Sequence, residues 1–295
     1  MASLAAQWPH ASMRTAEGIT LHYVDGGLKT RCLWCWCTAG PISGLGGGSP
    51  GFGQSSTPQN VEAYGAKNVT NDLAALLDGL NIEKAVFLGH DWGGGMVWRM
   101  CLYHPERVIA VGAVPYFSTK NFWRMLKNTG KMLDTAPRRF LTAVFRKHSE
   151  MSPTLEDGKM PIIGTLQGVT NSTDPIFTQR SAMLSEEELQ YYVDQYTLQV
   201  PEHVPILRDS RDRFQGRARH VFYHQPPSAV HQAANDHVLK PELARKMHRF
   251  LPNLETHVVD DAGHWVLWEQ KERVNAILKS WLDKIPAPVA NRSKL

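Results

Sequence analysis

The amino-acid sequence predicts an α/β fold, with a mostly parallel sheet, helices on both faces and an inserted α-helical region. Two runs, at 85–88 and 108–114, are almost entirely apolar, which is typical of strands covered on both faces. Segments with apolar residues at helical spacing alternate with these runs, and such alternation favours parallel strands joined by helices. Between 116 and about 205 helix-like segments follow one another, so we expect an insertion there.

The core elements can be assigned in chain order. Residues 20–24 form the first expected strand, and an amphipathic helix spans about 69–80, where apolar residues recur every three or four positions. The buried strand that starts at Ala85 and breaks at Gly89 comes next, and it leads into a helix that ends at His104-Pro105. The strand 108–114 completes this half of the core.

The second half contains the inserted helices and the return of the core. We expect cap helices at 137–145 and 185–196, and the second begins with the Ser185 and Glu188 spacing of a capping box. A strand at 256–259 and a last helix with an apolar face at 274–285 follow.

The domain boundaries follow from these assignments. We place the N-terminal part of the core at 1–115, the helical cap at 116–205, the C-terminal part of the core at 206–288 and an exposed tail at 289–295.

The composition is that of a globular protein. The chain has 295 residues, of which 42% are hydrophobic and 20% charged, enough for one large α/β domain or two small ones. The net charge of +4 is spread along the chain without a basic run, so we expect no nucleic-acid partner. We also expect no membrane span and no secretory signal, because no segment approaches the ~20 apolar residues of a membrane helix.

Four cysteines, three of them Cys32, Cys35 and Cys37, do not have the pattern of a disulfide framework. No second Cys/His cluster lies at zinc spacing from them. We therefore expect buried free thiols and no metal or other cofactor.

The most informative segment joins the strand that starts at Ala85 to the helix that follows it. Gly89 and Gly93 flank Asp91 with the spacing of the G-x-S-x-G nucleophile elbow, and Asp stands in place of the serine. The free N–H groups and the dipole at a helix N-terminus favour an anion at this point. Asp91 is therefore a candidate covalent nucleophile.

Such a nucleophile needs a base and a group that orients the base. His264 follows the strand at 256–259 on a loop, and Asp236 precedes a helix that Pro241 could open. The chain order nucleophile, acid, histidine is that of the α/β-hydrolases. Taken singly, His264 is better interpreted as a surface histidine and Asp236 as a helix cap. The three residues together favour a catalytic set.

Three segments make the chain resemble the epoxide hydrolases of the α/β-hydrolase fold. They are Gly89-His-Asp-Trp-Gly-Gly94, Asn235-Asp-His-Val-Leu-Lys-Pro241 and Ala262-Gly-His-Trp265. Segments 137–141 and 187–192 are similar to parts of the family's cap. The resemblance covers about two-thirds of the chain and implies an α/β-hydrolase fold with a helical cap and a small apolar epoxide as substrate.

The mechanism that this resemblance implies has two steps. Asp91 attacks a ring carbon of the epoxide and forms an alkyl-enzyme ester. His264, oriented by Asp236, then takes a proton from water, and this water attacks the ester carbonyl of Asp91. The backbone N–H of Trp92 would stabilise the oxyanion formed there, and a second donor is normally needed.

The chain departs from the family's pattern where further donors are expected. The H-G-x-P motif that carries the second oxyanion donor is absent from the matching segment, 29–50. The motifs of the two cap tyrosines that donate to the epoxide oxygen are not visible either. Four tyrosines remain candidates, although helix-core or surface roles are favoured for each: Tyr191, Tyr192, Tyr196 and Tyr223.

Two stretches, near 32–50 and 200–232, lack periodicity and are rich in Arg, Pro, Gly, Cys or Ser. The first is too short for the strand, helix and strand normally found there. The second has paired prolines where a strand should precede Asp236, and proline suits a strand interior badly. We therefore expect a sheet that is incomplete near both stretches. Our hypothesis is out-of-frame translation or mis-joined exons, with a divergent lineage as the alternative.

Two other functions stay open. A haloalkane dehalogenase uses the same Asp, His and acid; there Trp92 would help to hold the halide, and no donor to a ring oxygen is required. A catalytically impaired remnant, or a faulty gene model, would keep the three residues without the missing donors. Losing one oxyanion donor costs on the order of 10²–10³ in rate.

The chain ends in Ser293-Lys294-Leu295, a tripeptide that is read as a peroxisomal address when it is C-terminal. We therefore expect the peroxisomal import receptor as a partner and the peroxisome as the location, with the cytoplasm as the location otherwise.

Overall fold

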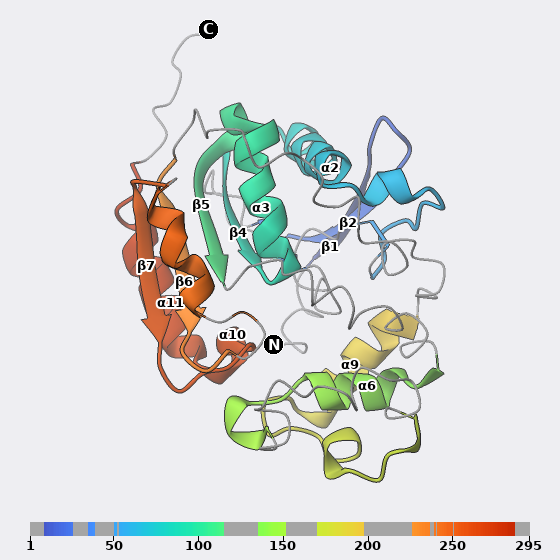
Figure 1. Cartoon of the computed structure of the whole chain (residues 1–295). Coiled ribbons are helices and arrows are strands. Elements are labelled where there is room, and N and C mark those ends of the chain that lie inside the picture. Colours follow the sequence, from blue (N-terminus) through green and yellow to red (C-terminus); the bar gives the residue numbers. More distant parts are fainter. Residues whose placement is uncertain are drawn as a thin grey trace, which may run out of the picture.

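A computed structural model describes residues 9–25, 35–38, 50–51, 53–114, 135–151, 170–197, 226–236, 239, 241–249 and 251–286. Within this part of the chain, five parallel strands form one sheet in the order β3-β4-β5-β6-β7 (Figure 1). These strands are β3 (Cys35–Thr38), β4 (Ala85–His90), β5 (Val108–Val114), β6 (Ser228–Ala233) and β7 (Leu254–Val259). A separate antiparallel pair is β1 (His10–Arg14) and β2 (Thr20–Val24). The predicted parallel sheet is confirmed.

Helices of the core connect these strands. They are η2 (Val61–Tyr64), α2 (Ala66–Gly79), α3 (Trp92–Tyr103), η3 (Pro105–Arg107), η10 (Pro241–Arg249), α10 (Val266–Glu269) and α11 (Lys271–Leu282). Helix α3 ends at Tyr103 because His104 is followed by a proline, which disfavours helical conformation in the residue before it. None of the described helices is long and apolar enough to cross a membrane.

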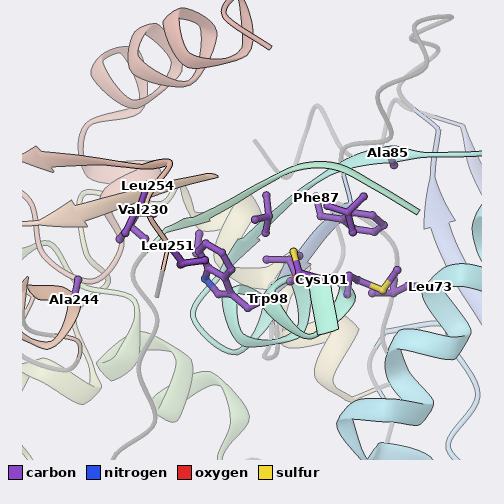
Figure 2. Packing of buried hydrophobic residues seen from close by; sticks show 14 of the residues in the cluster. Leu73, Ala85, Phe87, Trp98, Cys101, Val230, Ala244, Leu251 and Leu254 are labelled. Atoms are coloured by element: carbon purple, nitrogen blue, oxygen red, sulfur yellow. The ribbon is translucent and has the colours of Figure 1, made fainter. Parts of the chain in front are cut away.

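The sheet has one buried apolar cluster on each face, and β4 contributes to both. Phe87 packs with residues of α2 and α3 in the cluster shown in Figure 2, which includes Leu73, Trp98 and Cys101. Its neighbour Leu88 points to the other face, where Trp281 of α11 is buried. Because side chains alternate along a strand, a strand with apolar residues at every position must be covered on both sides.

The cap elements gather beside the core rather than on the sheet faces (Figure 1). They are α6 (Pro137–Val144), η5 (His148–Glu150), η6 (Pro175–Phe177) and α9 (Glu186–Thr197). Helices α6 and α9 pack together around a buried apolar cluster, which Trp265 of the core joins. The capping box is present, since Ser185 Oγ accepts from Glu188 N at 3.1 Å and Glu188 Oε2 accepts from Ser185 N at 2.8 Å.

The sheet is not incomplete at residues 228–232, and this expectation from the sequence is wrong. Strand β6 lies inside the sheet, paired with β5 on one side and β7 on the other. Pro226 and Pro227 stand just before the strand, where the missing N–H groups remove no ladder bond, and the carbonyl of Pro227 accepts from Val111 N at 3.0 Å.

In the first irregular stretch, β3 pairs with β4 at the sheet edge, so this strand is also present. The rest of that stretch lies outside the described residues. Residues 115–134, 152–169 and 198–225 also lie outside them, as does the tail after 286. The domain boundaries at 1–115, 116–205, 206–288 and 289–295 therefore stay predictions.

A buried imidazole in the core has a consequence for stability. His231 of β6 is 1% exposed and stacks on His257 of β7, with ring centroids 5.1 Å apart. Both of its ring nitrogens are buried without a hydrogen-bond partner among the described residues. Burial, and then the neighbouring His257, lower the pKa of His231 to about 3, so it stays neutral in the folded protein under mildly acidic conditions.

We expect the free energy of unfolding of His231→Gln to fall less steeply below pH 6.5 than that of wild type. Between pH 6.5 and 3 the unfolded chain binds a proton at residue 231 that the folded protein does not bind, so stability is lost as the pH falls. Wild type should lose up to about 2 kcal/mol more of its free energy of unfolding between pH 6.5 and 5 than the His231→Gln protein does. Urea unfolding of both proteins at several pH values measures the difference, and His248→Gln, at an exposed histidine, is the matched control. Equal slopes for all three proteins would contradict the prediction.

Candidate active site

Asp91 lies between β4 and α3 in a strained backbone conformation. Its φ of 52° and ψ of −120° fall outside the regions that residues with a Cβ prefer. Such outliers persist only where the surrounding structure enforces them, and they are common at functional sites. A strand that turns this sharply into a helix displays the side chain at the turn, as a nucleophile elbow does.

Gly89 shows why the turn requires glycine. A Cβ atom at this position would lie 2.3 Å from the carbonyl oxygen of Gly93, a backbone atom that cannot move aside. The strand and the first turn of α3 therefore approach each other too closely for any side chain. The glycine spacing in the sequence reflects this contact.

The structure brings Asp91, His264 and Asp236 together from three separate segments. His264 lies on the loop between β7 and α10, and its Nε2 is 3.9 Å from Asp91 Oδ1. Its Nδ1 is 3.0 Å from Oδ2 of Asp236, which follows β6. All three residues lie beyond the carboxyl ends of parallel strands of one sheet, namely β4, β6 and β7, so the topology of the sheet places them at one edge.

Asp236 is held in place from its other side. Its side chain is fully buried, and Oδ1 accepts a hydrogen bond from the N–H of Leu239 at 2.8 Å. Each carboxylate oxygen of Asp236 thus has a partner, one backbone amide and one imidazole. A buried carboxylate needs such partners, because desolvation otherwise makes its charge costly.

Opposing influences set the protonation of His264. Burial alone would lower its pKa, because the charged imidazolium loses hydration. The hydrogen-bonded Asp236 raises it, and the charges of Asp91 and Glu269 add to this effect. The carboxylates prevail and raise the pKa of His264 to about 9. At neutral pH His264 is therefore an imidazolium beside the Asp91 carboxylate.

His90 is a residue of the site that the sequence reasoning did not single out. Its Nε2 lies 2.9 Å from the backbone carbonyl oxygen of His264. A carbonyl can only accept, so Nε2 carries the proton and donates. Burial, followed by the charge of His264, lowers the pKa of His90 to about 3, which keeps the ring neutral. A polar residue ending an apolar strand directly before Asp91 was the available signal.

Trp92 is the first residue of α3, directly after Asp91. The N–H at this position has no acceptor within the helix, which suits the expected donor role. The structure describes its backbone, and its side chain lies outside the described part. Of the segment 29–50, expected to carry the second donor, only 35–38 and Pro50 are described. The segments expected to carry the two cap-tyrosine motifs lie outside the described part as well.

The described tyrosine candidates lie in the cap. Tyr192 and Tyr196 of α9 are buried in its apolar cluster, and burial raises the pKa of both phenols. These positions agree with the helix-core role favoured from the sequence. Tyr191 is half-buried beside them, and Tyr223 lies outside the described residues.

Three further expectations concern residues with no bearing on this site. Among the described residues no group of three potential metal ligands occurs. Cys101 is a buried free thiol, and burial raises its pKa to about 12. Ser293, Lys294 and Leu295 lie outside the described part of the chain, so the peroxisomal address stays a prediction.

The fold and the site can be compared with known proteins. A family model described as alpha/beta hydrolase fold matches residues 49–271, which include Asp91, Asp236 and His264. The chain belongs to this family. Among curated relatives, the chain is 27% identical over 314 residues to bifunctional epoxide hydrolase 2 of Mus musculus, covering 92% of the chain and 55% of that protein. The chain thus spans about half the length of this relative.

A shorter match is 48% identical over 64 residues to epoxide hydrolase A of Mycobacterium tuberculosis, covering 22% of this chain and 20% of that protein. Two solved structures share the fold over nearly the whole chain. Epoxide hydrolase A from Mycobacterium thermoresistibile has a TM-score of 0.74 at 22% identity, covering 95% of this chain and 99% of that one. An epoxide hydrolase from an endophytic Streptomyces has a TM-score of 0.77 at 20% identity, covering 94% and 95%.

Proposed function

We propose that this hydrolase opens an epoxide to a diol through an ester of Asp91, which water activated by His264 then hydrolyses. The observation that carries the proposal is an aspartate at the nucleophile elbow, with His264 beside it and Asp236 bound to the other nitrogen of the His264 ring. A carboxylate nucleophile attacks saturated carbon, whereas a serine at this position would attack a carbonyl. The similarity to epoxide hydrolases supports the choice of substrate class.

In the first step an oxygen of Asp91 forms a bond to a ring carbon of the epoxide. The ring carbon–oxygen bond breaks, and its electron pair stays on the ring oxygen, which takes up a proton from solvent. His264 releases its own proton to solvent as Asp91 loses its charge. The ionised state of Asp91 is favoured by the imidazolium of His264 at 3.9 Å and by the N-terminus of α3. No base acts in this step.

In the second step His264 Nε2 takes a proton from water, and the hydroxide oxygen bonds to the carboxyl carbon of Asp91. The N–H of Trp92 would stabilise the oxyanion at this carbon. The intermediate then expels the diol oxygen, which receives the proton from His264, and the carboxylic acid left at Asp91 passes its proton back to His264. The sum of both steps is one epoxide and one water converted to one diol, with the protein regenerated.

Charge couples the two steps. Esterification neutralises Asp91, so one of the groups that raise the pKa of His264 is lost. The pKa of His264 therefore falls in the ester, which favours the neutral imidazole at the moment when a base is required. Asp236 keeps Nδ1 protonated and leaves the lone pair of Nε2 for the water.

Single-turnover hydrolysis in ¹⁸O-water tests the proposal, with protein in excess over an aryl epoxide. The first diol should carry no ¹⁸O, and the peptide containing Asp91 should become heavier by one ¹⁸O. Direct attack of water on the epoxide would instead label the diol and leave Asp91 unlabelled, which contradicts the proposal.

A primary haloalkane assayed in parallel separates the rival functions. Halide release without diol formation from the epoxide would identify a dehalogenase. Failure to turn over either substrate would identify the impaired remnant.

A further inference from the structure

One carboxylate links the loop of His264 to the cap. Glu269 is the last residue of α10, and its Oε1 accepts from Gly263 N, the amide next to His264, at 3.0 Å. Its Oε2 accepts from His148 N, at the start of η5 in the cap, at 2.8 Å. The two oxygens of a single side chain therefore hold two segments that are 115 residues apart in the sequence.

We propose that Glu269 is a positioning residue: it sets the place of His264 and seats the cap over the site with the same carboxylate. The inference rests on the proposed function for the step that it names. The hydrogen bonds themselves do not depend on that function.

The residue on the other side of His264 is also tied to the cap. Trp265 is 6% exposed, and its Nε1 donates to the carbonyl oxygen of Val144, at the end of α6, at 2.6 Å. Its ring packs against Phe145 with centroids 4.5 Å apart. Both neighbours of His264 thus contact the cap, Gly263 through Glu269 and Trp265 directly. A shift of the cap must move the backbone on both sides of the histidine.

The contact at Gly263 leaves little room for adjustment. A Cβ atom there would lie 3.1 Å from Cβ of His148 and 3.2 Å from Oε1 of Glu269. The loop, the cap and the carboxylate are therefore closely packed at this point. Close packing allows the two hydrogen bonds to fix a position rather than merely tether two mobile segments.

Glu269 also acts on His264 through its charge. The groups that face the imidazole are Asp236 after β6, Asp91 at the elbow, Glu269 on α10 and His90 at the end of β4. The three carboxylates favour the imidazolium, and His90 is neutral. Replacing Glu269 by glutamine therefore lowers the pKa of His264. It also removes one of the two acceptor oxygens that hold the loop of His264 to the cap.

These effects fall on one chemical step. Formation of the Asp91 ester needs no base, whereas its hydrolysis needs His264 in place. Loss of the Glu269 carboxylate should consequently slow ester hydrolysis much more than ester formation. A change that merely lowered the folded fraction would slow both steps equally.

The experiment compares Glu269→Gln, Glu269→Asp and the control Glu272→Gln in the full chain. Glu272 lies three residues further on, and its side chain is 82% exposed, so its replacement removes the same charge without touching the loop. Rapid mixing with an aryl epoxide and mass spectrometry follow the ester on Asp91. Glu269→Gln should slow its hydrolysis at least about tenfold and leave its formation within about twofold. Glu269→Asp keeps the charge and should fall between wild type and Glu269→Gln, and the control should match wild type.

A second measurement does not depend on activity. Glutamine keeps one acceptor oxygen, so one of the two amides, Gly263 or His148, faces its NH₂ group and loses its acceptor. Amide hydrogen exchange at that residue should accelerate at least about tenfold in Glu269→Gln, and NMR titration should find a lower pKa for the His264 ring. If wild type forms no ester but these shifts occur, the proposed function fails and the positioning role stands. Unchanged exchange at both amides with an unchanged ring pKa overturns the positioning role. Equal slowing of both chemical steps also overturns it.

Discussion

Replacing His264 by glutamine is expected to trap the protein as an ester of Asp91 and to lower turnover by about 10⁴-fold. The first step does not use the imidazole, so one equivalent of epoxide should still react. The second step loses its base, and the ester then persists. Glutamine is preferred to alanine because its amide can still donate to Asp236, whose buried carboxylate would otherwise lose its partner at 3.0 Å.

Intact-protein mass spectrometry after mixing with an aryl epoxide measures this result, and fragmentation places the adduct on residue 91. The exposed His248→Gln is the control, because it removes an imidazole far from the reaction and should turn over like wild type. A thermal unfolding scan confirms that the variant is folded. A His264→Gln protein that turns over at the wild-type rate, or that carries the adduct on another residue, contradicts the two-step mechanism.

Removing the nucleophile should have the largest effect on activity, and the two variants that remove it should differ in their free energy of unfolding. Asp91→Ala and Asp91→Gly both lack the attacking oxygen, so turnover should fall on the order of 10⁶-fold and no ester should form. The two variants should differ in stability. Residue 91 has a φ of 52°, where glycine is unstrained and alanine is not, so Asp91→Gly should be more stable than Asp91→Ala by about 1 kcal/mol.

Diol formation under steady state and urea unfolding measure these two effects. The Asp91→Ala protein serves as the stability control, because it differs from Asp91→Gly by one methyl group. Residual turnover in ¹⁸O-water that gives an ¹⁸O-labelled diol would indicate direct attack of water on the epoxide. Equal stability of the two variants would mean that the backbone relaxes at residue 91, against the interpretation of a strained elbow.

The sequence predicted the regular elements well where periodicity is strong. The apolar runs at 85–88 and 108–114 lie in β4 and β5, and the amphipathic segment near 69–80 lies in α2. Patterns of this kind report directly on which faces are buried. The prediction failed at β6, where Pro226 and Pro227 were taken to interrupt a strand that starts just after them.

The supporting residues of the site could not be predicted in the same way. His90 and Glu269 act through hydrogen bonds to the backbone at 263 and 264. Backbone groups are alike at every position, so no residue type in the sequence marks them as partners. The link from Glu269 to His148 joins segments whose approach depends on how the cap folds back.

By itself the sequence determined the chemical types at the site: a carboxylate at a glycine-flanked elbow, a histidine, and an acid between them in chain order. These follow from local spacing, because Gly89 and Asp91 belong to one turn and apolar runs indicate the strands. The tertiary structure decided that His264 lies between Asp91 and Asp236, that its pKa is raised to about 9, and that the cap is tied to its loop. Those properties depend on distances between distant segments and on shared burial, which exist only once the sheet and the cap have packed.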